Sequence, residues 1–243
     1  MQWLSKVMLN LHIGNILDRK VSILSKTQIG NICKINDKTY SVKDGFTYIN
    51  YLDTGNITNN VIDNIQHIDL QKEKFPSRAK RKVQYNSIVY STVRPNQRHF
   101  GIVKSQPNNF IVSTGFAVID VDEKLADPEY VYYFLTQNDI VEQLQAIAEQ
   151  STSAYPSIKP SDIADLEIQL PSIETQKKVA SILHTIDLKI ENNTNINENL
   201  RFLWIKFVRL IRLFLRSLAS VGEYLLCSAI YISPHNYCRL CYQ

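Results

Sequence analysis

The residues best suited to binding chemistry lie between two apolar runs, within the segment 85–103. Its centre brings guanidinium, amide and imidazole groups together at Arg94, Asn96, Gln97, Arg98 and His99. Side chains of these types hydrogen-bond to base edges and to phosphate oxygens, so the segment favours recognition of nucleic acid. The alternative is the solvated tip of a hairpin with no binding role.

Two predicted strands hold this segment in place. Residues 88–93 are mostly β-branched or aromatic, which suits a half-buried pleated surface. Pro95 lacks an N–H group and biases Arg94 away from helix, so the first strand should stop there. A second strand then follows in the run that begins at Phe100.

The charge of the chain is concentrated rather than spread. The 243 residues carry a formal net charge of +4, with 44% hydrophobic and 21% charged residues, which describes a globular protein and excludes a disordered or fibrous one. Residues 71–104 hold nine Lys and Arg against Glu73 alone, whereas residues 105–200 hold five Lys against 15 acidic residues. A focused basic patch steers a polyanion to one surface. The alternative is that this basic face pairs with the acidic half of the same domain.

Two further segments are candidates for contact with a polyanion. The first leads into the opening strand and supplies Arg78, Lys80, Arg81 and Lys82, which we expect to contact phosphate. The second is a hydroxyl-rich loop over residues 151–161, where Ser153, Tyr155 and Lys159 are the candidates. A solvated linker and a plain connecting loop are the respective alternatives.

The remaining pattern predicts strands followed by helices. Strands are expected at residues 46–52, 110–113, 116–121 and 163–170. Asp127, Pro128 and Glu129 form a helix start, and that helix should run to about Gln150 with its aromatic side in the core. A short amphipathic helix is predicted within residues 1–27.

A long helix should begin at about Glu174. Apolar residues at heptad spacing form a seam that should pack against another helix, with one polar position that would fix register. Its members are Val179, Ile182, Leu183, Ile186, Ile190 and Asn193. The alternative is a helix packed onto its own domain.

Residues 201–243 differ from the rest of the chain. Arg rather than Lys is the more frequent basic residue here, and three of the four cysteines lie in this segment. Charged residues keep every apolar run shorter than the ~20 residues of a membrane span. We interpret this tail as the product of a shifted reading frame; a basic amphipathic surface helix is the alternative. His235, Cys238 and Cys241 have metal-like spacing, but one Cys-x-x-Cys pair is too weak a signal to predict a metal site. Few cysteines and no secretory pattern favour a cytoplasmic location.

Several motifs, in order, carry a resemblance to a known family. They are residues 49–57, 75–83, 88–96, 112–119 and 170–183. Over about residues 28–200 the chain resembles the specificity subunit of type I restriction–modification systems, with one target-recognition domain and the conserved helix that follows it. Aligned with the family signature Leu-Pro-Pro-Leu-x-Glu-Gln, the chain keeps Gln176 and has Glu174 at the variable position, while Ser172 and Thr175 depart from it.

The resemblance implies an α+β fold: a mixed-sheet target-recognition domain (residues 1–172), then a long coiled-coil-like spacer and dimerisation helix (173–200), ahead of the tail (201–243). It implies a non-catalytic, DNA-binding subunit that reads half of a bipartite site in double-stranded DNA and directs methyltransferase and restriction endonuclease subunits to it. No cofactor is expected on this chain, because S-adenosylmethionine, ATP and magnesium belong to the partner subunits. No membrane partner is expected either.

A complete family member carries two such domains and two helices, so the single domain here leaves two readings. Two copies of the chain pair through the seam and rebuild the two-fold arrangement, or the chain is a truncated, non-functional fragment. A third hypothesis, from another class, is a helical interaction protein that does not bind DNA.

Overall fold

The computed structural model describes residues 25–151 and 155–230. It divides into two units, residues 1–184 and 185–243, each of which is described by itself. The amphipathic helix expected within residues 1–27 lies almost entirely outside the described residues. The described part of that segment belongs to the strand β1 (Ser25–Gln28).

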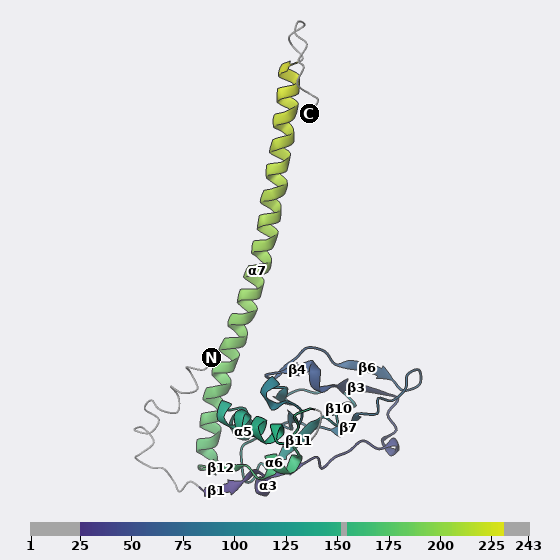
Figure 1. Cartoon of the computed structure of the whole chain (residues 1–243), viewed down its shortest axis with the longest axis vertical. Coiled ribbons are helices and arrows are strands. Elements are labelled where there is room, and N and C mark those ends of the chain that lie inside the picture. The colour runs from purple at the N-terminus through teal and green to yellow at the C-terminus, as the bar shows by residue number, and fades with distance from the viewer. Residues whose placement is uncertain (1–24, 152–154, 231–243) are drawn as a thin grey trace, which may run out of the picture. The chain divides into compact units, whose positions relative to one another are not determined.

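Two four-stranded sheets form the centre of the first unit (Figure 1). One has the order β2-β11-β8-β9, and the other has the order β6-β3-β10-β7; the pairs β1-β12 and β4-β5 complete the strands of the described residues. Their bounds are β2 Cys33–Ile35, β3 Tyr48–Leu52, β4 Ile57–Thr58, β5 Val61–Ile62, β6 Gln66–Asp69, β7 Ala79–Lys82, β8 Ile88–Ser91, β9 Phe100–Ile102, β10 Phe110–Ser113, β11 Phe116–Val121 and β12 Glu167–Leu170.

The helices are short, apart from the last one. Their bounds are α3 Ile29–Ile32, α4 Pro128–Leu135, α5 Asn138–Glu149, α6 Pro160–Ala164 and α7 Ile173–Ile230, with 3-10 turns η1 Val42–Asp44, η2 Thr54–Asn56 and η3 Pro95–Gln97. This combination of mixed sheets and helices confirms the predicted α+β class with a long helix at its end.

The alternation of side chains along the strands produces layers. In β8, Ile88 and Tyr90 face a core shared with Leu135 of α4 and Leu144 of α5. Val89, between them, faces the opposite way, into a core shared with residues of β3 and β10. The far face of the β3–β10 sheet carries a third, smaller cluster. One helical layer and two sheets therefore stack in this order, and the predicted aromatic side of α4 packs against the first core.

The predicted hairpin is confirmed. Strands β8 and β9 pair antiparallel, with Tyr90 opposite Phe100, and η3 lies between them. The strands predicted over residues 46–52, 110–113 and 116–121 are present as β3, β10 and β11. Strand β10 pairs parallel with β3 and antiparallel with β7, which makes this sheet mixed.

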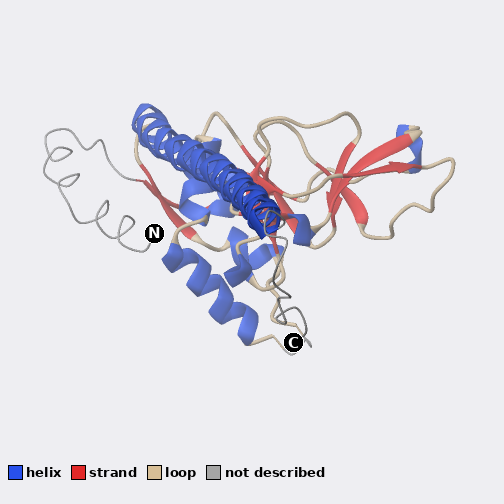
Figure 2. Cartoon of the chain, turned by 90° about the horizontal axis from the view of Figure 1, so that it is seen from above, coloured by secondary structure: helices blue, strands red, loops and turns tan. Residues whose placement is uncertain are grey.

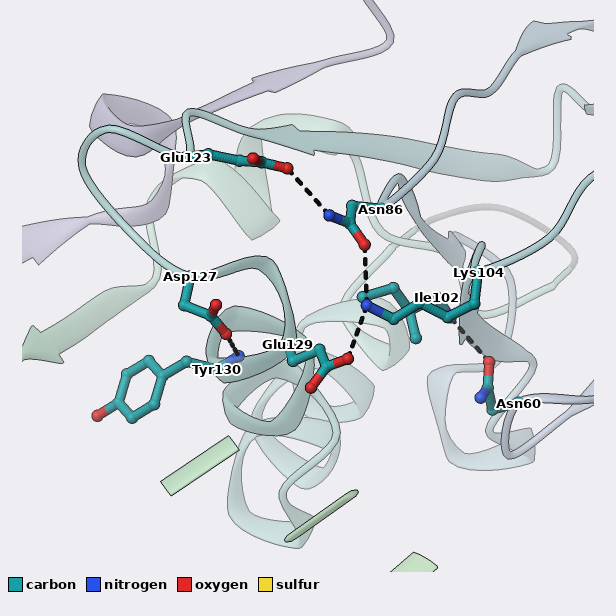
Figure 3. Close-up of polar contacts among 8 residues, drawn as sticks. All are labelled: Asn60, Asn86, Ile102, Lys104, Glu123, Asp127, Glu129 and Tyr130. Carbon is teal, nitrogen blue, oxygen red and sulfur yellow. Dashed lines mark hydrogen bonds and ion pairs between the residues drawn. The ribbon is translucent and has the colours of Figure 1, made fainter. Parts of the chain in front are cut away.

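The outer edge of β9 is covered by a loop rather than left open. The N–H groups of Asn59 and Asn60 donate to the carbonyl oxygens of Arg98 (2.9 Å) and Phe100 (2.8 Å). The side-chain oxygen of Asn60 then accepts from the N–H of Ile102 at 2.8 Å (Figure 3). These bonds occupy edge groups that would otherwise be a template for pairing with another chain.

The predicted helix at Asp127 is present but is shorter than expected. The Asp127 side chain accepts from the N–H of Tyr130 at 3.0 Å, as an N-cap does (Figure 3). The helix ends at Leu135, because Gln137 adopts an extended conformation as the N-cap of α5. The strand predicted over residues 163–170 was also partly wrong: α6 occupies its first residues, and β12 begins only at Glu167.

The long helix begins at Ile173, one residue before the predicted start, and continues without a break to Ile230 (Figures 1 and 2). Its first turn is anchored by Gln176, which is 1% exposed. The Gln176 side chain accepts from the N–H of Asp127 (2.9 Å) and donates to the carbonyl oxygen of Pro171 (2.9 Å). This accounts for the Gln of the signature: it ties the start of α7 to the start of α4. Nothing marks residue 200 as an end of helix, and the boundaries at 172 and 200 stay a prediction.

Candidate nucleic-acid interface

Four segments that are distant in sequence meet through backbone hydrogen bonds. The N–H of Thr114 donates to the carbonyl oxygen of Arg78 (2.8 Å), and the N–H of Thr92 donates to that of Gly115 (2.8 Å). The carbonyl oxygen of Thr92 in turn accepts from the N–H of Ile158 (2.8 Å). The predicted basic segment, hairpin and hydroxyl-rich loop are therefore neighbours in the fold, joined by the turn between β10 and β11.

Arg94 and Tyr155 lie at one end of this arrangement. The N–H of Arg94 donates to the carbonyl oxygen of Pro156 (2.9 Å), and its guanidinium lies 5.3 Å from the centre of the Tyr155 ring. Arg94 adopts a left-handed backbone conformation (φ 48°), which is uncommon for a residue with a side chain. Arg94 is exposed, and Tyr155 is 61% exposed, so both present their polar groups to solvent.

The other residues of the hairpin tip are held more closely. The guanidinium of Arg98 donates to the side-chain oxygen of Asn138 at 2.5 Å, and the N–H of Asn96 donates to the side chain of Gln145 at 3.2 Å. These bonds join the tip to α5. The side chains of Asn96 and Gln97 remain exposed, whereas Arg98 is half-buried and has a structural partner.

Arg78 lies in a different environment, beside a network of buried polar groups. It precedes β7, in a turn closed by the N–H of Ala79 donating to the carbonyl oxygen of Pro76 (3.0 Å). A Cβ atom on Gly115 would come within 2.6 Å of the Arg78 Nη2 atom, so the guanidinium lies directly over the glycine. Arg78 is exposed to solvent.

The charge of Arg78 also acts on the carboxylate of Asp53, although the two groups form no ion pair within 4.0 Å. Burial raises the pKa of this carboxylate, but hydrogen bonds from the Thr54 backbone and the Ser113 hydroxyl, the charge of Arg78 and the Tyr51 hydroxyl outweigh burial, so that the pKa of Asp53 lies below its ordinary value. The Tyr51 hydroxyl lies 3.2 Å from the Asp53 Oδ1 atom. Ser113 is fully buried and Tyr51 is 5% exposed. Asp53 is thus an ionised group. No sequence pattern singled it out, although Asp53 directly follows β3 and Ser113 ends the parallel strand β10.

The remaining residues of the basic segment lie in different environments. Lys80 is exposed, whereas Lys82 forms an ion pair with Asp44 at 2.6 Å. Arg81 is half-buried, and its Nε atom has no hydrogen-bond partner among the described residues. Of the predicted second loop, Lys159 is exposed and its N–H donates to Asp162 (2.7 Å) at the start of α6. Ser153 lies outside the described residues.

The acidic half of the domain pairs with one residue of the basic stretch. Lys104 forms an ion pair with Glu129 (2.7 Å) and donates to Asn86 (2.8 Å), which donates in turn to Glu123 at 2.9 Å (Figure 3). Among the described residues, Arg78, Lys80 and Arg94 belong to no ion pair within 4.0 Å. The basic stretch is therefore neutralised in part: Lys72, Lys82 and Lys104 have carboxylate partners, whereas within the described ranges these three residues do not.

The candidate residues of the helix seam fall into two groups. Val179, Leu183 and Ile186 are half-buried, whereas Ile182 (56%), Ile190 (39%) and Asn193 are exposed. Further along α7, large apolar side chains such as Leu200 (58%) and Trp204 (64%) are exposed as well. Within the described part of the chain, no helix is apolar and long enough to cross a bilayer, and no three His, Cys, Asp or Glu side chains are grouped as a metal site would need. His235, Cys238 and Cys241 lie outside the described residues.

Fold and site together define a domain that presents exposed arginines beside an aromatic ring, ahead of a long helix. Comparison with known proteins gives the family. Residues 24–201 match the model of the type I restriction modification DNA specificity domain, and the chain belongs to this family.

Two curated relatives and two solved structures are similar to the chain. It is 32% identical to the type I restriction enzyme HindI specificity subunit of Haemophilus influenzae, over 62% of this chain and 32% of that protein. It is 34% identical to the MjaIX specificity subunit of Methanocaldococcus jannaschii, over 40% of this chain and 22% of that protein. The chain thus spans a third or less of the curated relatives it matches.

The crystal structure of the HsdS subunit from Thermoanaerobacter tengcongensis superposes with a TM-score of 0.59 at 23% identity, over 70% of this chain and 43% of that one. A second solved structure, described as the structural basis underlying complex assembly and conformational transition of the type I R-M system, gives the same TM-score and identity. The match covers 91% of this chain and 52% of that one. These two likenesses show the fold.

Proposed function

We propose that the chain reads DNA sequence as a specificity subunit of a type I restriction–modification complex. The observation that carries the proposal is that Arg78 and Arg94 lie on adjacent segments, are exposed and, among the described residues, form no ion pair within 4.0 Å, with Arg94 beside the exposed ring of Tyr155. Guanidinium groups can contact phosphates or guanine edges, and an exposed ring can stack on or pack against the nucleic acid. Membership of the specificity-domain family supports DNA as the polyanion.

The rest of the proposal follows the family. The chain itself carries out no catalysis, and partner methyltransferase and restriction subunits bind S-adenosylmethionine, ATP and magnesium. Residues 1–172 would read one half of a bipartite site, residues 173–200 would set the spacing, and the complex would act in the cytoplasm. The names of the HindI and MjaIX relatives, both specificity subunits of type I restriction enzymes, support these assignments.

We further propose that a second copy of the chain reads the other half of the bipartite site. The exposed seam residues Ile182, Ile190 and Asn193 on α7 support this, since an apolar stripe at heptad spacing is buried when two helices pair. Size-exclusion chromatography with light scattering should then give twice the chain mass, and Ile190→Asp should return the monomer.

The decisive experiment is co-expression with the cognate modification subunit, followed by mapping of methylated adenines across a genome. A bipartite methylated motif is the expected result. In vitro, duplex affinity should fall steeply with salt, because binding releases counterions from the phosphates.

The exposed apolar side chains of α7 also favour a second candidate, a helical interaction protein that does not touch DNA. It predicts that no salt-dependent duplex binding occurs even with modification subunits present. That result would replace the proposal.

A further inference from the structure

We propose that Arg78 reads one guanine of the DNA target; this inference rests on the proposed function. The sequence pattern alone suggested a phosphate contact for Arg78. The surroundings of the guanidinium point instead to a base edge.

The guanidinium of Arg78 has a defined place. Its Nη2 atom lies where a side chain on Gly115 would be, and a Cβ atom at that position would also come within 2.8 Å of the Thr54 Cγ2 atom. The backbone of Arg78 is held in a turn and bonded to Thr114. Paired donors to the O6 and N7 atoms of guanine must be presented in a fixed plane, whereas a phosphate tolerates a mobile cation.

The charge around Arg78 favours the same role. Asp53 and Arg78 form no ion pair within 4.0 Å, but the charge of Arg78 contributes to the lowered pKa of Asp53, so an ionised carboxylate lies in the neighbourhood of the guanidinium. A neighbouring carboxylate weakens attraction to a phosphate but leaves the remaining N–H donors of the guanidinium available. Lys80, two residues further on, is exposed and has no ion pair among the described residues, which suits a phosphate contact.

The guanidinium side of this site is also accessible to a DNA duplex. Arg78 is exposed, although Ser113 and Tyr51 behind it are buried. The backbone bonds through Thr114, Gly115 and Thr92 also place this turn next to the hairpin strand that leads to Arg94. A duplex that reaches Arg94 would therefore meet a second, preoriented arginine nearby.

The test uses the full chain in complex with its modification subunit and compares methylation rates on duplexes in which each position of the mapped site is varied. Arg78→Ala should lower the rate preference for guanine over the other bases at one position by about 5- to 150-fold and leave the other positions unchanged. Arg78→Lys keeps the charge but lacks the planar fork, so it should lose the same preference.

Gly115→Ala tests the placement without removing the arginine. The new methyl group would come within 2.6 Å of the Arg78 Nη2 atom and 2.8 Å of the Thr54 Cγ2 atom, so both must shift. Far-UV circular dichroism in urea first establishes that the variant is folded, and its methylation pattern should then relax at the same position. Gly55→Ala is the matched control, since nothing lies within 4 Å of its added Cβ.

Lys80→Ala should give the pattern of a lost phosphate contact: methylation falls equally on all sequences, and duplex affinity depends less steeply on salt. The inference is overturned if Arg78→Ala gives that uniform pattern, while the proposed function stands. If the wild-type complex methylates no defined motif, the proposed function fails and takes this inference with it.

Discussion

Gly101 is the position where a single methyl group should do most damage to the hairpin. It lies in β9 opposite Val89. A Cβ atom there would come within 2.6 Å of the Ile57 Cδ1 atom, 2.7 Å of the Asn60 Oδ1 atom and 3.3 Å of the Asn60 Cα atom. Gly101→Ala therefore forces the covering loop away from the strand.

The cost can be worked out from these neighbours. Ile57 and Asn60 both border a cavity of about 200 Å³, into which the terminal methyl group of Ile57 can move. Asn60 is held by hydrogen bonds instead, because its side chain accepts from Ile102 and its N–H donates to Phe100. Overpacking of this kind costs about 1–3 kcal/mol, and loss of the bond to Ile102 adds about 1 kcal/mol. We expect Gly101→Ala to lower the free energy of unfolding by ~2–4 kcal/mol.

Urea denaturation of the full chain, followed by far-UV circular dichroism, measures this change. Gly55→Ala serves as the control, since its added Cβ meets nothing within 4 Å. At such a site the loss of backbone freedom in the unfolded chain should make alanine neutral or stabilising by up to about 1 kcal/mol. If the two variants unfold at the same urea concentration, Asn60 does not pack against β9 as described.

Three other predictions follow from the same structure. Arg94→Ala should weaken duplex binding by about 1–3 kcal/mol without changing stability, whereas Arg98→Ala, which breaks the bond to Asn138, should lower the unfolding free energy by ~1 kcal/mol or more; equal stability of the two variants in urea would contradict this contrast. Asp127→Ala should cost about 1 kcal/mol through loss of the α4 cap, and Asp127→Asn, which keeps an acceptor, should recover most of it in the same assay. Burial, with a smaller effect from Asp120, raises the pKa of Cys33 to about 12, so at pH 8 its thiol should stay protonated and resist iodoacetamide until urea unfolds the chain; peptide mapping that finds it alkylated in the folded protein would refute its burial.

Local sequence signals were enough for the elements that depend on local chemistry. The β-branched and aromatic residues of segment 88–93 and the position of Pro95 predicted a hairpin, and Asp127 predicted a cap; both are present. The start of α6 also had a readable signal, Pro160 at the first helical position followed by Asp162, which the strand interpretation overlooked. The break before α5 had none, since neither Thr136 nor Gln137 is a residue that ends helices strongly.

The candidate site was predictable by residue type but not by arrangement. Arg94 and Arg98 have the same chemistry and lie four residues apart, yet one stacks over Tyr155 and the other bonds to Asn138. Asp53 and Ser113 meet because β3 and β10 pair in parallel, with Leu52 opposite Val112. Pairing across 60 residues depends on the tertiary fold, which no local pattern records. The family of the chain, by contrast, was recognisable from ordered motifs and is confirmed.

The antiparallel pair β1-β12 has a consequence for how such domains can be exchanged (Figure 2). Ser25 lies opposite Leu170, three residues before α7 begins, so the segment from β1 to β12 starts and ends at adjacent points. This segment forms a cassette with both ends at one place. Replacing that cassette by another with the same paired ends would leave α7 with its original starting point, so a new reading specificity could be grafted by recombination without rebuilding the helix.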